Sequence, residues 1–493
     1  MRWPSVAGAG LGSVLVLLAG CGDTEKVREF EPDPVAWGGC VEYLDEPETA
    51  IECATLNVPL DHADPGGAEI NLAVARLPAT AEPRIGVLAL NPGGPGGSGI
   101  EFLNWFGPYV AETGLLGRFD LVSFDPRGVG ASTPVRCGED LDNEFVILGP
   151  DEGLPEVLQA AEEMVEACRE QSGNLLAHVG TNAAARDLDL LRRALGEERL
   201  TYLGYSYGTR LGAAYAGLYP DQVRAMVLDG PVDPTEHPSR PTRIQADGFE
   251  SSWTAFARWC ADNLDCQLNA HGGADVVLDA VLAAAAVSPL PAGEREVTES
   301  EVYLGVLAGL YSPGYWPDMA TGLFEVVDNG SAEILQAFGD LMAGRREDGS
   351  YDGSVDAMFL IDCADDPERP PPSEVYEANE AIAASLARFN SAFRGSVGCH
   401  PLPEAVDPLH MGSADLLVPA LVVALEGDPA TPPFWAERLA LVLEDAVVVW
   451  SDAEGHGAYL AHSWCLTGPI TDYLIDLVVP LDGWSCDEPD GWP

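Results

Sequence analysis

Short apolar runs recur along the chain, separated by longer amphipathic stretches. The first two runs have the character of antiparallel strands, and the second alternates apolar and polar residues. Six later runs are continuously apolar, a pattern typical of strands buried on both faces of a parallel sheet. The predicted strands are Ala54–Leu60, Ile70–Leu77, Ile85–Asn91, Phe119–Asp125, Leu200–Tyr205, Ala225–Asp229, Pro419–Glu426 and Ala446–Trp450.

Helical patterns lie between several of these strands, for example over Thr181–Leu195 and Tyr207–Leu218. Strands that alternate with helices predict the α/β class, a mainly parallel sheet with helices on both faces. The interval from about Thr235 to His410 breaks this alternation and is helical in pattern. Its expected helices are Ala274–Val287 and a segment in which Ile334, Leu335, Phe338, Leu341 and Met342 share one face.

The composition is that of a folded protein with an acidic surface. Of the 493 residues, 47% are hydrophobic, and 79 acidic residues against 25 basic ones give a formal net charge of -54. Such a surface repels nucleic acid and anionic membranes, so we expect neither as a partner. Two explanations stay open: solubility where salt screens the charge, or an acidic field that attracts cationic substrates.

The N-terminus has the pattern of a bacterial export signal. Arg2 precedes an apolar stretch, Val6–Leu18, which is too short to span a bilayer as a mature helix. The stretch ends in LAGC at residues 18–21, which resembles a lipobox, whose cysteine is lipidated and becomes the new N-terminus. We therefore expect an exported protein tethered to the cell envelope only through Cys21. The alternative is an ordinary cleaved signal peptide and a secreted protein.

The other cysteines suit an oxidising compartment. Eleven cysteines less Cys21 leave ten, an even number typical of a disulfide framework. No CxxC pair or Cys/His cluster has the spacing of a metal site. The sequence does not fix the connectivity, and pairing neighbours gives the hypothesis Cys40–Cys53, Cys137–Cys168, Cys260–Cys266, Cys363–Cys399 and Cys465–Cys486.

The strongest chemical signal is GYSYG at residues 204–208, which matches the pattern G-x-S-x-G between a predicted strand and a predicted helix. Its glycines permit a tight turn whose strain exposes the serine hydroxyl. The following helix adds backbone donors and partial positive charge. With the eight strands, the motif predicts an α/β-hydrolase fold in which Ser206 is the nucleophile. The alternative is a glycine-rich turn without chemistry.

A serine nucleophile needs a base, and the base needs an orienting acid. In α/β-hydrolases the chain order is serine, acid, histidine. Asp428 follows the seventh predicted strand and His456 the eighth, so we predict them as acid and base. Asp229 and Asp233, after the sixth strand, are alternative acids or turn caps. The remaining histidines are interpreted as structural or surface residues, among them His462 in a helical pattern, His62 and His410.

A glycine-rich loop, NPGGPGGSG at residues 91–99, directly follows the third predicted strand. In this fold that loop supplies one oxyanion donor, and the residue after the nucleophile supplies the other. Gly94 and Tyr207 are therefore the predicted donors. Phosphate binding is the alternative, but the loop lacks the Gly-Lys-Ser/Thr ending of a P-loop. Asp125 and Arg127, after the fourth strand, are expected to fix the neighbouring loop.

Five motifs in this order resemble those of the secreted tripeptidyl aminopeptidases. These belong to the proline iminopeptidase family of serine peptidases, which includes mycobacterial cell-envelope lipoproteins. The motifs are the glycine-rich loop, DPRGVG at 125–130, GYSYG at 204–208, GDPATP at 427–432 and GHG at 455–457. The resemblance spans about Trp37 to Cys486 and includes CATLNVPLD at 53–61 and IDCAD at 361–365. Asn91 opens the glycine-rich loop, as in the tripeptidyl group, where simpler iminopeptidases have histidine.

The resemblance implies an exopeptidase that releases short units, tripeptides, from peptide N-termini without a metal or organic cofactor. Such an enzyme must bind a free ammonium group, and Asp365 is one carboxylate that would serve, unless it is merely exposed. An esterase or lipase with the same three residues is the competing function. A peptide-binding surface lipoprotein without catalysis is a third interpretation.

The predicted organisation divides the chain into five parts. A signal peptide (1–20) and a tether (21–36) precede the first part of the α/β-hydrolase core (37–234). A helical cap (235–410) is inserted between strands six and seven, and residues 411–493 complete the core.

Overall fold

The computed structural model describes residues 30–44, 46–48, 50–138, 153–240, 242–389, 396–412 and 414–488. The predicted signal peptide, Cys21 and the tether as far as residue 29 lie outside these ranges. Among the described helices, none combines the length and the apolar character that crossing a membrane requires.

All eight predicted strands are present in one sheet. Within the described residues this sheet has nine strands, because a short strand near the C-terminus extends its edge, so the prediction of eight was one too few. The order across the sheet is β1-β2-β4-β3-β5-β6-β9-β10-β11. The strands are β1 (Glu52–Pro59), β2 (Glu69–Leu77), β3 (Gly86–Asn91), β4 (Phe119–Phe124), β5 (Leu200–Tyr205), β6 (Val223–Asp229), β9 (Ala420–Gly427), β10 (Ala446–Glu454) and β11 (Trp484–Cys486).

Parallel pairing dominates the sheet. The strand β2 pairs antiparallel with β1 and β4, whereas each neighbouring pair from β4 to β11 is parallel. The carboxyl ends of the parallel strands therefore share one edge. At that edge Asn91 is paired with Gly204, and Tyr205 is paired with Asp229. The predicted functional residues follow these strand ends, so the register collects them at one place.

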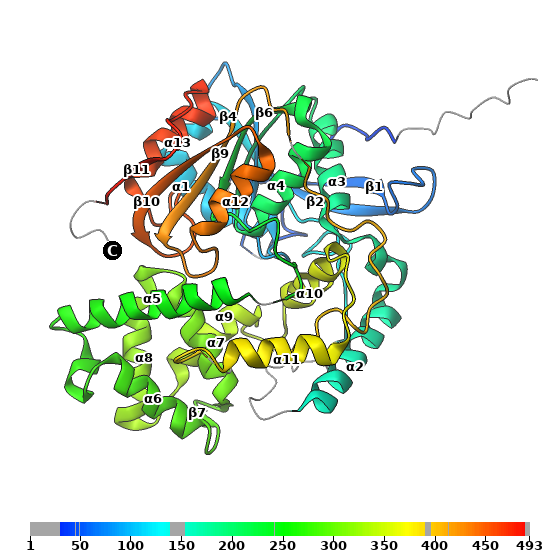
Figure 1. The fold of residues 1–493 in the computed structure, drawn as a ribbon. Helices are drawn as coiled ribbons and strands as arrows, with labels where there is room; N and C mark the ends of the chain where they lie inside the picture. The colour runs from blue at the N-terminus through cyan, green and yellow to red at the C-terminus, as the bar shows by residue number, and fades with distance from the viewer. Residues whose placement is uncertain are drawn as a thin grey trace, which may run out of the picture.

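Helices cover both faces of the sheet (Figure 1). Successive side chains of a strand point to opposite faces, and in β5 Tyr202 packs into one core while Leu203 packs into the other. This two-sided burial explains why the strand is apolar throughout. One face carries α1 (Gly99–Glu112) and α13 (Trp464–Asp476), and the other carries α3 (Thr181–Ala194), α4 (Tyr207–Leu218) and α12 (Phe434–Leu443), with α2 (Leu154–Ser172) beyond them.

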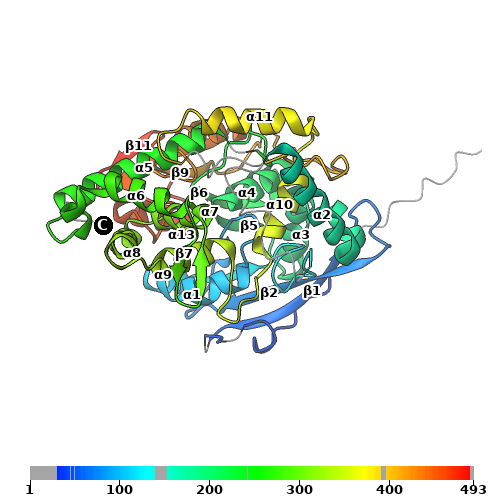
Figure 2. The ribbon, with the colours of Figure 1, turned by 90° about the horizontal axis from the view of Figure 1, so that it is seen from below.

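The chain between β6 and β9 forms a largely helical segment that lies on one side of the sheet-containing body (Figure 1) and covers much of it in the view of Figure 2. Its core is separate and includes the fully buried Trp253 and Phe256. Its elements are α5 (Arg243–Asp262), α6 (Ala274–Ala285), β7 (Leu290–Ala292), β8 (Arg295–Val297), α7 (Glu299–Leu310), α8 (Trp316–Asn329), α9 (Glu333–Ala343), α10 (Ser354–Asp365) and α11 (Pro372–Ala383).

Two details of this segment differ from the prediction. The strands β7 and β8 form a small antiparallel sheet where only helices were expected. In α9, Leu341 is 62% exposed although the pattern placed it on the apolar face. The reason is a close helix contact: a Cβ at Gly305 of α7 would lie 2.4 Å from the carbonyl oxygen of Leu335. This contact turns the side of α9 that carries Leu335 and Gly339 inward.

Disulfides join neighbouring cysteines along the chain. All five predicted pairs are present, which confirms the hypothesis drawn from sequence order. They are Cys40–Cys53, Cys137–Cys168, Cys260–Cys266, Cys363–Cys399 and Cys465–Cys486.

A buried arginine fixes the loop after β4. The side chain of Arg127 is fully buried, and its guanidinium donates to both carboxylate oxygens of Asp187 on α3 at 2.7 Å. Its other N–H groups reach the carbonyl oxygens of Leu60, His178 and Pro59 at 2.8, 2.9 and 3.0 Å. A buried charge is tolerated only with such complete pairing. The geometry agrees with the expected loop-fixing role of Arg127.

We expect Arg127→Met to lower the free energy of unfolding by about 3–5 kcal/mol, because Asp187 would be left buried and uncompensated. Glu166→Ala, which breaks an exposed ion pair with Arg169, is the control and should cost about 0–1 kcal/mol. Urea unfolding of the disulfide-intact protein, followed by tryptophan fluorescence, measures both. Similar losses in the two variants would contradict the prediction.

Candidate active site

Ser206 lies at the sharp turn between β5 and α4. Its backbone has φ 54° and ψ -124°, a region that a non-glycine residue occupies only where the surrounding structure enforces it. Its amide donates to the carbonyl oxygen of Asp229 at 2.9 Å. The flanking glycines are required, because a Cβ at Gly204 would lie 2.5 Å from the carbonyl oxygen of Gly208. The strand–turn–helix context predicted for this motif is confirmed.

Asp428 and His456 form a hydrogen-bonded pair. They lie at the ends of the neighbouring strands β9 and β10. The Nδ1 atom of His456 is 2.9 Å from Oδ2 and 3.0 Å from Oδ1 of Asp428. The Asp428 side chain is 1% exposed and that of His456 is 13% exposed. A carboxylate on Nδ1 fixes the tautomer and leaves Nε2 for proton transfer.

Thr431 holds the carboxylate of Asp428 from the other side. Its hydroxyl donates to Oδ2 at 2.9 Å and lies 3.3 Å from Nδ1 of His456. The backbone amides of Ala430 and Thr431 donate to Oδ1 at 2.9 and 2.8 Å. From the sequence, Thr431 was named only as part of the GDPATP motif, and no role was predicted for it. The order Asp-Pro-Ala-Thr could have indicated its contact with Asp428, because an aspartate side chain commonly accepts hydrogen bonds from amides two or three residues further along the chain.

Tyr311, at the end of α7, brings the inserted segment to His456. The carbonyl oxygen of Tyr311 accepts from the His456 amide at 2.8 Å, and the two rings meet edge to face at 5.3 Å. Burial opposes charge on His456, but the negative charges of Asp428 and Asp229 outweigh it and raise the pKa of the imidazole. Nothing in the sequence indicated Tyr311, because its place depends on how the inserted segment packs.

The alternative acids have other partners. Asp229 accepts from the amides of Ala458 and Tyr459 at 2.8 and 2.7 Å, so it fixes the loop after His456. Burial raises the pKa of Asp229 to about 6. Asp233 accepts from the amide and hydroxyl of Thr235 and forms an ion pair with Arg438. Neither carboxylate takes the place that Asp428 occupies on Nδ1 of His456.

The other histidines have structural settings. The Nδ1 atom of His462 lies 2.9 Å from the Gly457 carbonyl oxygen and Nε2 lies 2.9 Å from the Ser312 hydroxyl. His462 precedes α13 rather than belonging to a helix, which corrects the helical interpretation. His62 packs beside the buried Asp187 at 2.9 Å, and His410 is exposed.

The glycine-rich loop is pressed against the Ser206 turn. Gly93 has φ 99°, and a Cβ there would lie 2.5 Å from the Tyr205 carbonyl oxygen and 2.8 Å from Ser206 Cβ. Within the described residues, neither the Gly94 nor the Tyr207 amide donates to an acceptor of the chain. Tyr207 also begins α4, whose N-terminus favours negative charge. The arrangement suits the predicted oxyanion role of these two amides.

The Asp125 carboxylate ties this loop to its neighbour. It accepts from the Ser98 hydroxyl at 2.7 Å and the Ile100 amide at 3.1 Å, both at the end of the glycine-rich loop. Its second oxygen accepts from the Ala131 amide at 2.8 Å. Burial raises the pKa of Asp125 against these hydrogen bonds. Asp125 therefore holds two loops together, as expected.

Ser206 and His456 both follow strand ends at the carboxyl edge of the sheet, and no hydrogen bond joins them among the described contacts. Gly230 lies between the two residues. The residue before it, Asp229, accepts a hydrogen bond from the Ser206 amide through its carbonyl oxygen. A Cβ placed at Gly230 would lie 3.2 Å from Cε1 of His456. In ligand-free enzymes the hydrogen bond between nucleophile and base is often long and shortens with substrate.

Asp365 is a structural residue rather than an open ammonium site. It is fully buried and accepts from the amide and hydroxyl of Thr181 at 2.6 and 2.5 Å. Arg210 of α4 lies 3.5 Å from its carboxylate. These groups occupy the oxygens that an ammonium ion would need, so the structure disfavours the predicted substrate contact. It also excludes the alternative that Asp365 is merely exposed.

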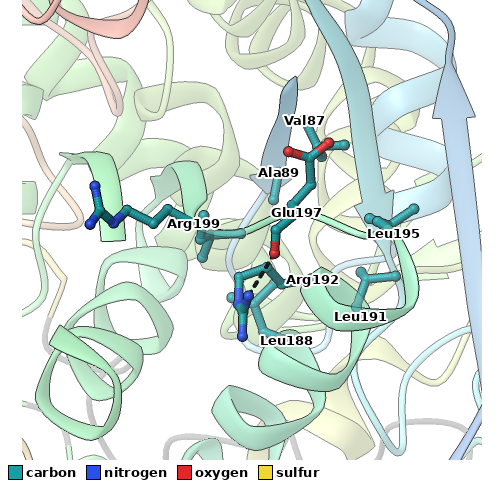
Figure 3. A pocket seen from close by; sticks show the side chains of 9 residues that line it. Val87, Ala89, Leu188, Leu191, Arg192, Leu195, Glu197 and Arg199 are labelled. Atoms are coloured by element: carbon teal, nitrogen blue, oxygen red, sulfur yellow. Dashed lines mark hydrogen bonds between the residues drawn. The ribbon is translucent and has the colours of Figure 1, made fainter. Parts of the chain in front are cut away.

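Two cavities were found outside the Ser206 turn. One, between α3 and the sheet, is lined by residues such as Val87, Leu188 and Arg192 and encloses about 10 Å³ (Figure 3). A space of that size holds at most one water molecule, so it has no binding role. The other has a volume of about 670 Å³ and is lined by Ser98 of the glycine-rich loop, the loop after β4 and the chain leading into α10.

The fold and the arrangement of the site residues together define the class of enzyme to which the protein belongs. The topology is that of an α/β-hydrolase, in which a serine on a strained turn faces a carboxylate-bound histidine beside a glycine-rich loop. The protein is a serine hydrolase. In the described part of the chain, no cluster of three or more histidine, cysteine, aspartate or glutamate side chains could hold a metal ion.

Comparisons with known proteins agree with this class. A family model described as alpha/beta hydrolase fold matches residues 86–271, and one described as TAP-like protein matches residues 388–486. Serine protease Hip1 of Mycobacterium tuberculosis is 37% identical over 97% of this chain and 96% of its own. Carboxylesterase B of the same organism is 34% identical over 95% and 92%. Tripeptidyl aminopeptidase of Streptomyces lividans is 30% identical over 90% and 84%.

These relatives cover nearly the whole chain, so the likeness is not confined to the common hydrolase core. The chain belongs to the tripeptidyl aminopeptidase family of α/β-hydrolases, and it is a serine peptidase of the α/β-hydrolase type.

We expect Thr431→Val to lower kcat/KM roughly 10- to 100-fold, because a hydrogen bond to a charged group is worth about 1.5–3 kcal/mol and valine keeps the shape. Steady-state kinetics and the rate of Ser206 labelling by a fluorophosphonate measure the effect. Thr254→Val, which removes an exposed hydroxyl bonded within α5, is the matched control. Unchanged kinetics in Thr431→Val would show that the hydroxyl does not support Asp428.

We expect the rate of fluorophosphonate labelling to rise with pH through a midpoint above 6.5, the ordinary pKa of histidine. The reason is that His456 must be neutral to accept a proton, and its neighbouring carboxylates raise its pKa. An uncharged probe ensures that the titration belongs to the protein. His410→Asn should leave the profile unchanged, and a midpoint at or below 6.5 in the native enzyme would contradict the assignment.

Proposed function

We propose that this protein is an exported serine exopeptidase that releases short units, tripeptides, from the N-termini of peptides. The observation that carries the proposal is the Asp428–His456 pair beside the strained Ser206 turn, under a helical segment that reaches His456 through Tyr311. The relatives named serine protease and tripeptidyl aminopeptidase support the peptide substrate.

Acylation begins when Ser206 Oγ attacks the scissile carbonyl carbon. Nε2 of His456 takes the hydroxyl proton, and Asp428 stabilises the imidazolium that forms. The carbonyl oxygen gains negative charge, which the amides of Gly94 and Tyr207 stabilise by donating hydrogen bonds. Both amides are free of acceptors among the described residues, so they need not break a bond to act.

The acyl-enzyme then forms and breaks down with the same groups. His456 gives its proton to the leaving amine nitrogen, the C–N bond breaks, and the N-terminal unit stays esterified to Ser206. Water attacks the ester as His456 takes one of its protons. That proton returns to Ser206 Oγ as the peptide unit leaves with a free carboxylate. No cofactor is needed in this sequence of steps.

Export and a lipid anchor at Cys21 belong to the same proposal. The apolar stretch Val6–Leu18 and the LAGC sequence support them. The five disulfides of the described residues suit an oxidising compartment outside the cytosol. Short peptides in the cell envelope are the partners we propose. We propose no contact with nucleic acid and no membrane contact other than the lipid.

An esterase acting through the same residues is the second candidate. It is favoured by the 34% identity to a relative named carboxylesterase. The chemistry differs only in the leaving group, an alcohol instead of an amine. We therefore propose that the inserted segment and the cavity beside the glycine-rich loop decide the substrate.

We expect the body of the enzyme after Cys21 to hydrolyse a free-amine tripeptide anilide and to leave the N-acetylated tripeptide anilide nearly intact. Dipeptide and single-residue anilides should react more slowly. Ser206→Ala should lose several orders of magnitude in kcat. Ser331→Ala, at the partly exposed turn before α9, serves as the control. Turnover of a short-chain ester alone would establish the esterase, and serine-independent hydrolysis would overturn the proposed chemistry.

A further inference from the structure

The cavity of about 670 Å³ lies next to the predicted oxyanion loop. Its walls are Ser98 and Glu101, the loop of residues 130–138 after β4, and residues 346–356 of the inserted segment. Its volume is within the range of small-ligand sites. The inserted segment closes directly on the glycine-rich loop here, because a Cβ at Gly96 would lie 2.1 Å from the Ser354 carbonyl oxygen.

Asp356 is the carboxylate in this cavity without a partner among the described residues. It lies half-buried in the first turn of α10, and burial alone raises its pKa to about 6. The other aspartates of the lining are engaged: Asp125 binds Ser98 and two backbone amides, and Asp352 accepts from the Ser354 amide at 2.7 Å. A desolvated carboxylate without a counter-charge gains most from binding a cation.

The lining also carries two arginines. Arg346 donates to the Tyr351 carbonyl oxygen at 3.1 Å, and the exposed Arg136 has its backbone amide bound to the Ser172 hydroxyl. No ion pair joins either arginine to Asp356 in the described structure. Within the described structure, neither arginine of the lining therefore supplies a counter-charge to the Asp356 carboxylate.

The helix that carries Asp356 is held firmly to the helix that follows Ser206. Arg210 of α4 forms ion pairs with Asp362 at 2.6 Å and with Asp365 at 3.5 Å, both on α10. Thr181 of α3 also bonds to Asp365. The buried residues Leu360 and Ile361 pack into the main core. Because α10 is fixed in this way, Asp356 has a fixed position relative to the Ser206 turn.

The separation suits a short peptide. Ser98 lines the cavity and follows Gly94 by four residues, so their Cα atoms lie within roughly 15 Å. An extended tripeptide spans about 10 Å from its N-terminal nitrogen to its last carbonyl carbon. The two lengths are of the same order, which is compatible with a peptide whose scissile carbonyl is at Gly94 and Ser206 and whose N-terminus lies in this cavity.

We propose that the cavity binds the N-terminal residues of the substrate and that Asp356 binds its free ammonium group. The inference rests on the proposed exopeptidase function and supplies a physical reason for the release of tripeptides. The distance between Asp356 and Ser206 would set the number of residues in the unit removed. Asp356 is a specificity-determining residue, whereas Asp365, at the other end of α10, only fixes the helix.

The test compares Asp356→Asn with the native enzyme on free and N-acetylated tripeptide anilides and on a free dipeptide anilide. We expect a roughly 10- to 100-fold rise in KM for the free tripeptide, as for the loss of a charged hydrogen bond. The slow reaction of the acetylated tripeptide should not change. The ratio of kcat/KM for tripeptide over dipeptide should fall towards one. The rate of fluorophosphonate labelling should stay native, which shows that the Ser206 site is intact.

Three further variants sharpen the result. Asp279→Asn removes one negative charge from the exposed side of α6 and should behave as native, which controls for net charge. Glu101→Gln, which changes another carboxylate of the lining, should affect the free tripeptide less than Asp356→Asn does. Ala131→Trp fills the cavity from an exposed position and should slow the free tripeptide while sparing a short-chain ester. This variant also tests the cavity if Asp356→Asn fails to fold.

The outcomes separate this inference from the proposed function. A native enzyme that prefers the free tripeptide, but keeps that preference in both Asp356→Asn and Ala131→Trp, would overturn the inference alone. A larger loss in Glu101→Gln than in Asp356→Asn would also overturn it. A native enzyme that cleaves free and acetylated tripeptides equally well would overturn the exopeptidase function and the ammonium site together.

Discussion

The active site depends on one steric constraint, the close packing of the Ser206 turn against the glycine-rich loop. A Cβ at Gly93 would lie 2.5 Å from the Tyr205 carbonyl oxygen, so no side chain fits between these two segments. The contact holds Ser206 at a positive φ of 54° and presses the loop that carries Gly94 against the turn that carries Tyr207. Strain at the serine is therefore maintained by packing, and the geometry is in place before substrate arrives.

Around this contact, buried carboxylates organise the loops. Asp428 orients His456, Asp229 binds the amides that follow His456, and Asp125 joins the glycine-rich loop to the loop after β4. Each carboxylate is buried and accepts hydrogen bonds on both oxygens, which makes it an effective anchor because leaving its donors unpaired would be costly. Asp356 differs, since it is half-buried and unpaired within the described residues, and that contrast separates a binding group from the scaffold.

The inserted segment between β6 and β9 contacts the active site. It contacts the site in two places: Tyr311 packs on His456, and α10 is locked to α4 through Arg210. A peptidase and an esterase share the chemistry of the serine turn, as the names of the relatives illustrate. We therefore propose that substrate choice comes from this segment and from the cavity that it closes.

The sequence by itself determined the parallel sheet and the strand–turn–helix at Ser206, and it correctly predicted the Asp428–His456 pair and the five disulfides, which the structure then decided against their alternatives. These features depend on local patterns and on chain order, which parallel pairing converts directly into proximity. The tertiary structure alone decided the burial of Asp365, the role of Tyr311 and the exposure of Leu341. Each of these depends on how one helix lies against another, and contacts between segments distant in the chain leave no periodic signal in the sequence.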